Sequence, residues 1–213
     1  MEVVARRGFD ATVDEIAQVS GVSPRTIFRH YASHDRLIAE TVRDMFEESG
    51  RYPDVGSPRE VDDLAGWIET LPQEVADVDG WLEDLAVTVH TRMAEVFGTA
   101  FWDIYAPPRP GSVALAEVAD LCRVYRLRGV RYMASIAWRS AGGAGEPPED
   151  LTLAFALQLS AHSTQALMRD FDRTPAQIGA LTADILKTLL HSAVQAQRSA
   201  RADFASADDG GEG

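Results

Sequence analysis

Apolar residues recur at intervals of three and four along most of the chain, which is the spacing of one face of an α-helix. No segment shows a sustained alternation of apolar and polar residues, the pattern typical of a half-buried strand. Segments rich in proline and glycine separate the periodic stretches. We therefore predict an all-α fold with helices over 13–20, 24–31, 37–50, 58–71, 80–105 (with a break near Gly98), 113–140, 149–171 and 175–199.

The first two of these helices have well-defined ends. Thr12 and Glu15 form a capping box, in which each side chain satisfies a backbone N–H at the helix start. Gly21 suits the left-handed position that ends a helix. Ser23 is a good N-cap, and Pro24 fits the first position of the second helix because its missing N–H needs no partner there. The two helices are expected to cross at a steep angle over a core of Ile16, Ala17, Val22, Ile27 and Tyr31.

The helix that begins at Pro24 has a polar outward face. Its residue types are those that contact guanine edges, thymine methyls and phosphates in a major groove: Arg25, Thr26, Arg29 and His30. One interpretation is a helix-turn-helix that binds duplex DNA. The alternative is an ordinary helical hairpin with a solvated polar face, since short capped helices are common.

The order of these elements resembles the start of TetR-family transcriptional repressors. The resemblance covers about the first fifth of the chain and is carried by Gly8-Phe9, Val13-Asp14-Glu15-Ile16-Ala17, Gly21-Val22-Ser23, Thr26-Ile27-Phe28-Arg29-His30-Tyr31 and, less closely, Ser33-His34-Asp35-Arg36-Leu37. It implies three DNA-binding helices, a fourth connecting helix, a larger helical domain that binds an effector, and dimerisation through the last two helices. It also implies a repressor that a small ligand releases from its operator.

On this basis we expect three regions. A helix-turn-helix DNA-binding domain with its connecting helix occupies residues 1–50, and a helical effector-binding and dimerisation domain occupies 51–201. Residues 202–213 are acidic and glycine-rich and are expected to form a disordered tail. The boundary lies in the turn-rich segment 52–58.

Three features depart from the family pattern. Only residues 1–7 precede Gly8, so the first helix is short and marginal by itself. We expect the true start to lie upstream of Met1; the alternative is a cropped, weaker DNA-binding domain. Phe28 stands where the family usually has a tyrosine that touches phosphate. His34 stands where a lysine commonly reaches the DNA backbone, so a phosphate contact there is expected to depend on pH.

The predicted DNA contacts include the polar face of the helix that begins at Pro24 and the positions at which the TetR family contacts DNA. They are Ser23, Arg25, Thr26, Phe28, Arg29, His30, Tyr31 and His34.

The charge balance argues against strong DNA binding. The net charge is −13, and residues 1–50 contain six arginines against nine acidic residues. Between Ser20 and Arg36 the balance is reversed, with three arginines and one aspartate. An acidic protein with a less negative tip would dock on DNA only through that tip. The alternative function is a TetR-like dimer that binds a ligand or a protein and has weakened or lost DNA binding.

The last two predicted helices, 149–171 and 175–199, carry a broader apolar surface than one neighbour needs to cover. We interpret it as the face of a homodimer that forms a four-helix bundle. Ordinary packing within one chain is the alternative. A two-fold dimer would place two DNA-binding domains about 34–36 Å apart, which matches a palindromic operator.

Aromatic residues on the predicted helices suggest a largely apolar cavity for a hydrophobic or aromatic effector. The candidate lining residues are Trp102, Tyr105, Tyr125, Met133, Trp138 and His162. For each of them, ordinary core packing is the alternative interpretation.

Other function classes find little support in the sequence. Cys122 is the single cysteine, which excludes a disulfide within the chain and is consistent with a reducing cytoplasm. No apolar run has the length of a membrane span, and no secretory signal is visible. The histidines are dispersed, and no Gly-rich phosphate loop or nucleophile motif occurs. We expect a cytoplasmic protein that is not an enzyme and has no metal and no cofactor.

Overall fold

The computed structural model describes residues 1–49, 72–97 and 112–208, and every element within these ranges is helical. The prediction of an all-α fold is confirmed. In chain order the elements are α1 (Glu2–Arg7), the 3₁₀ turn η1 (Gly8–Asp10), α2 (Val13–Ser20), α3 (Pro24–His30), α4 (His34–Ser49), α6 (Val78–Arg92), the π-helical turn η3 (Met93–Phe97), α8 (Val113–Ser140), α9 (Glu149–Gln158), α10 (Ala161–Phe171) and α11 (Pro175–Asp208).

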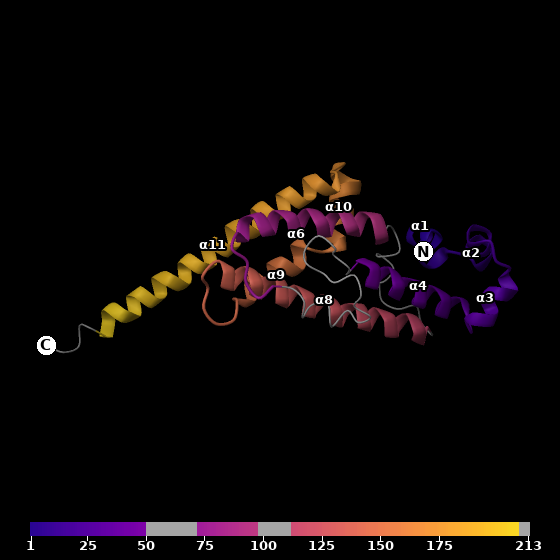
Figure 1. The fold of residues 1–213 in the computed structure, drawn as a ribbon, viewed down its shortest axis with the longest axis horizontal. Helices are drawn as coiled ribbons and strands as arrows, with labels where there is room; N and C mark the ends of the chain where they lie inside the picture. The colour runs from indigo at the N-terminus through magenta and orange to yellow at the C-terminus, as the bar shows by residue number, and fades with distance from the viewer. Residues whose placement is uncertain (50–71, 98–111, 209–213) are drawn as a thin grey trace.

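The molecule is elongated (Figure 1). Helices α1 to α3 form a head at one end, and the C-terminal end of α11 projects from the other. Helix α4 leads from the head into a body that contains α6, α8, α9, α10 and α11. Within the described part of the chain, α6 and α11 share the largest interface and run side by side.

Local side-chain chemistry sets the ends of the first head helices, as predicted. The Thr12 hydroxyl accepts a hydrogen bond from the Glu15 N–H, and the Glu15 carboxylate accepts one from the Thr12 N–H. Gly21 has φ 70° and ends α2 in the left-handed region. The Ser23 hydroxyl accepts a hydrogen bond from the Thr26 N–H at the start of α3. These contacts hold α2 and α3 at a defined turn.

A small apolar core joins α2 and α3 to the start of α4. Its buried members are Ala17, Ile27 and Leu37, with Ile16 and Tyr31 packed at its edge. The expectation that Val22 belongs to this core is wrong, because Val22 is 42% exposed. It lies in the turn directly after Gly21, where the chain has already left the packed face of α2.

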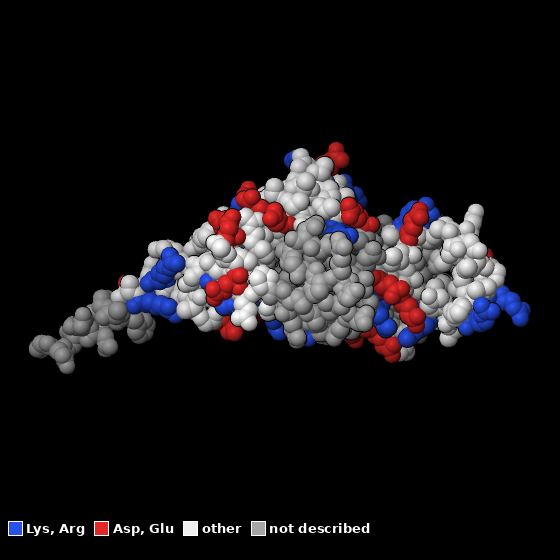
Figure 2. Space-filling model, in the orientation of Figure 1, with Lys and Arg blue, Asp and Glu red and all other residues white. Residues whose placement is uncertain are grey.

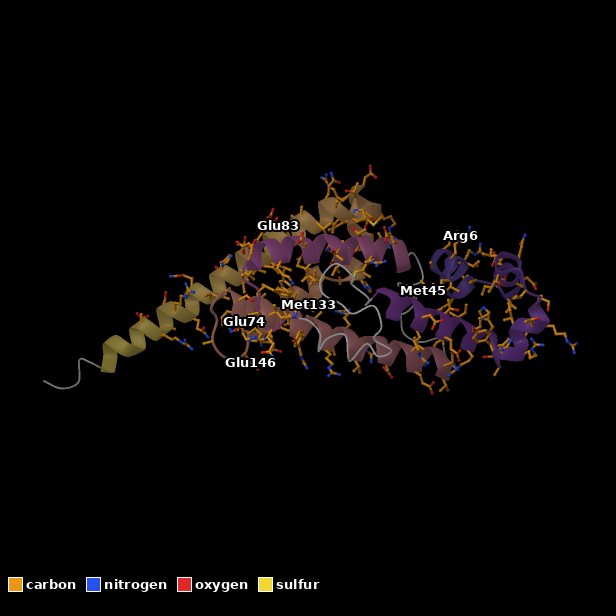
Figure 3. All side chains as sticks on the ribbon, in the orientation of Figure 1. Arg6, Met45, Glu74, Glu83, Met133 and Glu146 are labelled. Atoms are coloured by element: carbon orange, nitrogen blue, oxygen red, sulfur yellow. The ribbon has the colours of Figure 1, made fainter. Side chains whose placement is uncertain are left out.

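A second core connects the head to the body through α4. Val3 and Val4 of α1 are buried in the same cluster as Met45 of α4 and as Leu115 and Val118 of α8. Met45 lies at the end of α4 that faces the body (Figure 3). The apolar core therefore crosses the expected boundary near residue 50 and connects α1 to α8 by way of α4.

The main core lies between α6, α8, α9 and α11. Trp138, Phe155 and Leu186 are its large, fully buried members. Gly143, in the turn after α8, lies directly over the Trp138 indole, and a Cβ at this position would collide with the ring. Close approach of this turn thus depends on glycine.

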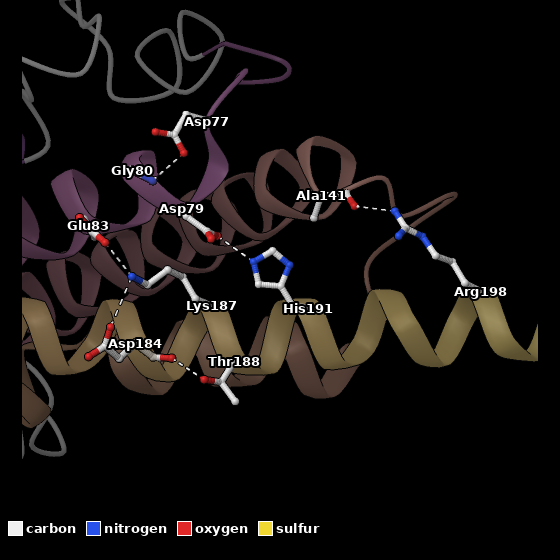
Figure 4. A network of polar contacts seen from close by, with 10 residues as sticks. All are labelled: Asp77, Asp79, Gly80, Glu83, Ala141, Asp184, Lys187, Thr188, His191 and Arg198. Carbon is white, nitrogen blue, oxygen red and sulfur yellow. Dashed lines mark hydrogen bonds and ion pairs between the residues drawn. The ribbon is translucent and has the colours of Figure 1, made fainter.

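Polar contacts on the outside of the molecule also join α6 to α11 (Figure 4). The Lys187 ammonium donates to the Glu83 carboxylate at 2.7 Å, and the hydrogen bond raises the pKa of Lys187. His191 Nε2 lies 2.8 Å from the Asp79 carboxylate. Both pairs are accessible to solvent, which screens the attraction between their charges, so they contribute little to stability. The buried apolar contacts beneath them supply most of the stability of this interface.

Three predicted helices differ from the observed ones. The single helix expected over 149–171 is broken at Leu159, which has φ −87° and ψ 46°, and Ser160 begins α10 by accepting a hydrogen bond from the Ser163 N–H. Helix α11 continues to Asp208, so residues 202–208 are helical and not a disordered tail. The helix expected over 80–105 changes to a π-helical turn at Met93. The predicted helix over 58–71 and the break near Gly98 lie outside the described residues.

Two further observations concern possible sites. None of the helices in the described ranges combines the length and hydropathy that a membrane crossing needs. Among the same residues, histidine, cysteine, aspartate and glutamate side chains do not gather in a group of three or more that could bind a metal.

Candidate DNA-binding head

Helix α3 presents most of the predicted contact residues to solvent. Arg25, Phe28, Arg29 and His30 are exposed, whereas Ile27 on the opposite side is buried in the head core. Within the described part of the chain, the side chains of Arg25 and Arg29 have neither a hydrogen bond nor an ion pair. Arginine side chains over α3 stand at the tip of the molecule (Figure 2). Their guanidinium groups are therefore available for an anionic partner.

The hydroxyl groups at the start of α3 serve the helix itself. Ser23 Oγ and Thr26 Oγ1 lie 3.0 Å apart and form a hydrogen bond, in addition to the cap from the Thr26 N–H to Ser23. Both groups are near the exposed surface and retain lone pairs for a further partner. Their first role is to begin α3 so that its arginines face outward.

Two of the predicted contact residues are tied to the head. Tyr31 ends α3 and packs against the head core, so that its ring is only partly exposed. His34 Nε2 donates to the Ala11 carbonyl at 2.6 Å, because a carbonyl oxygen can only accept. Its Nδ1 lies 3.5 Å from the Asp35 carboxylate. His34 therefore connects the start of α4 to the segment before α2. Its Nε2–H is already used in this hydrogen bond and does not point outward to donate to a DNA phosphate.

An acidic residue within the head is similarly engaged. Glu15 accepts hydrogen bonds from the Thr12 N–H and hydroxyl, which lower the pKa of its carboxyl group, and Arg7 lies 3.8 Å away. Its charge thus stabilises the start of α2 and is partly offset by an arginine of α1. The arginines on the exposed face of α3 have no such local partner.

Comparison with known proteins agrees with this geometry. Residues 1–41, from α1 to the first half of α4, match the family described as bacterial regulatory proteins, tetR family. The head, residues 1–41, is therefore a DNA-binding domain of the tetR type. The resemblance predicted from the turn, the caps and the face of α3 is confirmed. No significant match was found among the curated proteins or among the solved structures.

The TetR-type head is followed by a body in which the predicted effector residues are only partly brought together. Met133 and Trp138 lie in the main core, and Figure 3 shows Met133 among the body helices. His162 is exposed on α10, where desolvation and the neighbouring Arg126 lower its pKa. Trp102 and Tyr105, and the side chain of Tyr125, lie outside the described residues.

A groove between α9 and α11 was not anticipated from the sequence. Its volume is about 630 Å³. The lining residues are Trp138, Glu146, Pro148, Asp150, Leu151, Leu189, Ser192, Ala193, Ala196 and Gln197. Most of these belong to the two segments predicted to form the dimer, so the groove is a feature of that face.

A buried polar network in the body was also missed. The Thr164 hydroxyl donates to the Ser160 carbonyl at 3.0 Å, so it accepts from His90 Nδ1 at 2.7 Å. His90 Nε2 then accepts from the Thr182 hydroxyl at 2.9 Å. Burial lowers the pKa of His90 to about 4 and keeps the ring neutral. The network connects α6 to both α10 and α11.

Proposed function

We propose that this protein is a ligand-responsive transcriptional repressor of the TetR type. Two heads in a homodimer bind the halves of a palindromic operator, and a small apolar or aromatic effector bound in the helical body releases the DNA. The observation that supports DNA binding most directly is the exposed face of α3, with two arginines that lack a partner in the described part of the chain, within a domain that matches the tetR family.

Exposed apolar residues on α9 and α11 support the homodimer. Leu153 and Leu157 of α9 are 56% and 64% exposed, and Leu181 and Leu189 of α11 are 50% and 41% exposed. The opposite side of α11 packs against α6 through Leu186 and Leu190, so the exposed leucines are not needed for the core of one chain. A second copy would bury them and fill the groove between the two helices.

Removing both arginines of α3 is expected to weaken specific DNA binding. Arg25→Ala together with Arg29→Ala should weaken binding to DNA that flanks the protein's own coding region by about thirtyfold, or about 2 kcal/mol, since each arginine contact to a base or phosphate is substantial. A gel-shift titration at several salt concentrations measures this effect, and wild-type binding should weaken as salt rises.

The matched control removes two arginines from the opposite end of the molecule. Arg198→Ala with Arg201→Ala changes the net charge equally and lies on the C-terminal half of α11, where Arg198 donates to the Ala141 carbonyl at 3.3 Å. DNA binding should be unchanged. The absence of any salt-sensitive, specific shift with the wild-type chain would contradict the proposed regulator, and an equal loss in the control pair would show non-specific charge attraction.

The dimer face has its own test. Leu157→Glu with Leu189→Glu is expected to convert a dimer into a monomer, because two charges per chain would be buried at the interface. Light scattering at micromolar concentration measures the mass. Val124→Glu is the control, since Val124 is an exposed apolar residue of α8, outside this face. A wild-type monomer at this concentration would exclude the proposed bundle.

A further inference from the structure

Helix α3 exposes one large apolar side chain among its polar residues. Phe28 is 53% exposed and is not part of the head core. Residues three and four apart share one face of a helix, so Phe28 lies beside Arg25, and Arg29 follows it along the same exposed surface. An apolar ring therefore stands within the arginine-bearing surface that would enter the major groove.

The chemistry of the groove limits what this ring can bind. Base edges and phosphates offer hydrogen-bond donors and acceptors, for which a phenyl ring has no complement. The thymine C5-methyl is the apolar group that the major groove presents. Contact with this methyl would remove apolar surface of both groups from water, whereas packing against sugar would carry no sequence information.

We infer that Phe28 is a specificity-determining residue that recognises a thymine methyl in each half of the operator. The inference rests on the proposed function, because it requires that α3 binds DNA. Three residues of α-helix rise about 4.5 Å, and one base pair rises about 3.4 Å. The thymine should therefore lie one or two base pairs from a guanine bound by Arg25 or Arg29.

The experiment uses the full-length chain and a library of random duplexes. Selection with the wild type should yield sites with a thymine near a guanine, and Phe28→Ala should lose the preference for thymine while keeping that for guanine. Deoxyuridine lacks only the methyl group. Its substitution for that thymine should weaken wild-type binding about fourfold per half-site, as expected for one buried methyl, and should leave Phe28→Ala unaffected.

Two further measurements make the result decisive. Replacing the thymine by cytosine should weaken wild-type binding, and 5-methylcytosine at the same position should bind more tightly than cytosine. Val19→Ala is the matched variant, because Val19 is an exposed apolar residue of α2, outside the recognition helix. It should respond to deoxyuridine as the wild type does.

The possible outcomes separate the two claims. Specific binding with equal affinity for thymine and deoxyuridine at every position, or an unchanged thymine response in Phe28→Ala, would overturn the role of Phe28 and leave the regulator in place. Selection of no specific duplex by the wild type would overturn the proposed DNA binding, and the role of Phe28 with it.

Discussion

Gly179→Ala is expected to lower the free energy of unfolding by about 3 kcal/mol. Gly179 is buried where α11 passes close to α6, and a Cβ there would lie 2.5 Å from Val87 Cα and 2.8 Å from Val87 N. These atoms are backbone, so they cannot rotate away as a side chain would. The clash can be relieved only if α6 and α11 move apart along their shared core. The expected loss of stability therefore lies at the upper end of the range for overpacked sites.

Urea unfolding followed by circular dichroism measures this loss, and a second glycine provides the control. Gly129 lies within α8, and a Cβ at this position would meet no atom within 4 Å. Gly129→Ala should stabilise the protein by about 0.5–1 kcal/mol, because alanine loses less backbone entropy in a helix. Equal effects of the two substitutions would show that α6 and α11 do not approach as closely as the structure indicates.

The DNA-binding head is the part of this protein that sequence describes best, because its signals are local. The capping box at Thr12, the left-handed Gly21 and the Ser23 cap each act within a few residues, and all three occur as predicted. The exposed face of α3 follows from the same helix boundaries. Val22 is the exception in this segment, since apolar character alone does not show which way a turn residue points.

Breaks within apolar stretches are harder to predict. The spacing of apolar residues continues through Leu159 and Ser160, so periodicity favours one helix over 149–171. The Ser160 hydroxyl caps α10 instead, and this local bond interrupts the helix. Likewise, charge and glycine content favour a disordered tail, whereas α11 retains helical geometry to Asp208.

Contacts between distant residues set the roles of the histidines. His34 binds the carbonyl of Ala11, 23 residues earlier in the chain. His90 binds hydroxyls of Thr164 and Thr182, which follow it by 74 and 92 residues. None of these partners can be identified from spacing in the sequence. His34, predicted to contact a phosphate, instead joins the start of α4 to the segment before α2. His90 is the centre of a buried polar network that joins α6 to α10 and α11.

The burial of His90 leads to a second large expected effect, which depends on pH. In the folded protein the pKa of His90 is lowered from 6.5 to about 4, whereas the unfolded chain titrates near its ordinary value. Between these values the unfolded state binds a proton that the folded state does not. The stability contributed by neutral His90 is therefore fully present above pH 6.5, falls as the pH is lowered towards 4, and changes no further below that. The total loss is about 3 kcal/mol, since one pKa unit corresponds to about 1.4 kcal/mol.

The measurement compares unfolding free energies of the wild type and His90→Gln at several pH values from 7 to 4. The variant should be less stable at pH 7 because it disturbs two buried hydrogen bonds, but its stability should fall less steeply as the pH decreases. Thr182→Val removes one hydroxyl of the same network and keeps the imidazole, so it should lose stability at pH 7 yet retain the steep pH dependence. Parallel curves for the wild type and His90→Gln would show that His90 takes up its proton equally in both states. The link between this buried ring and acid destabilisation would then be wrong, even though the network itself joins α6, α10 and α11.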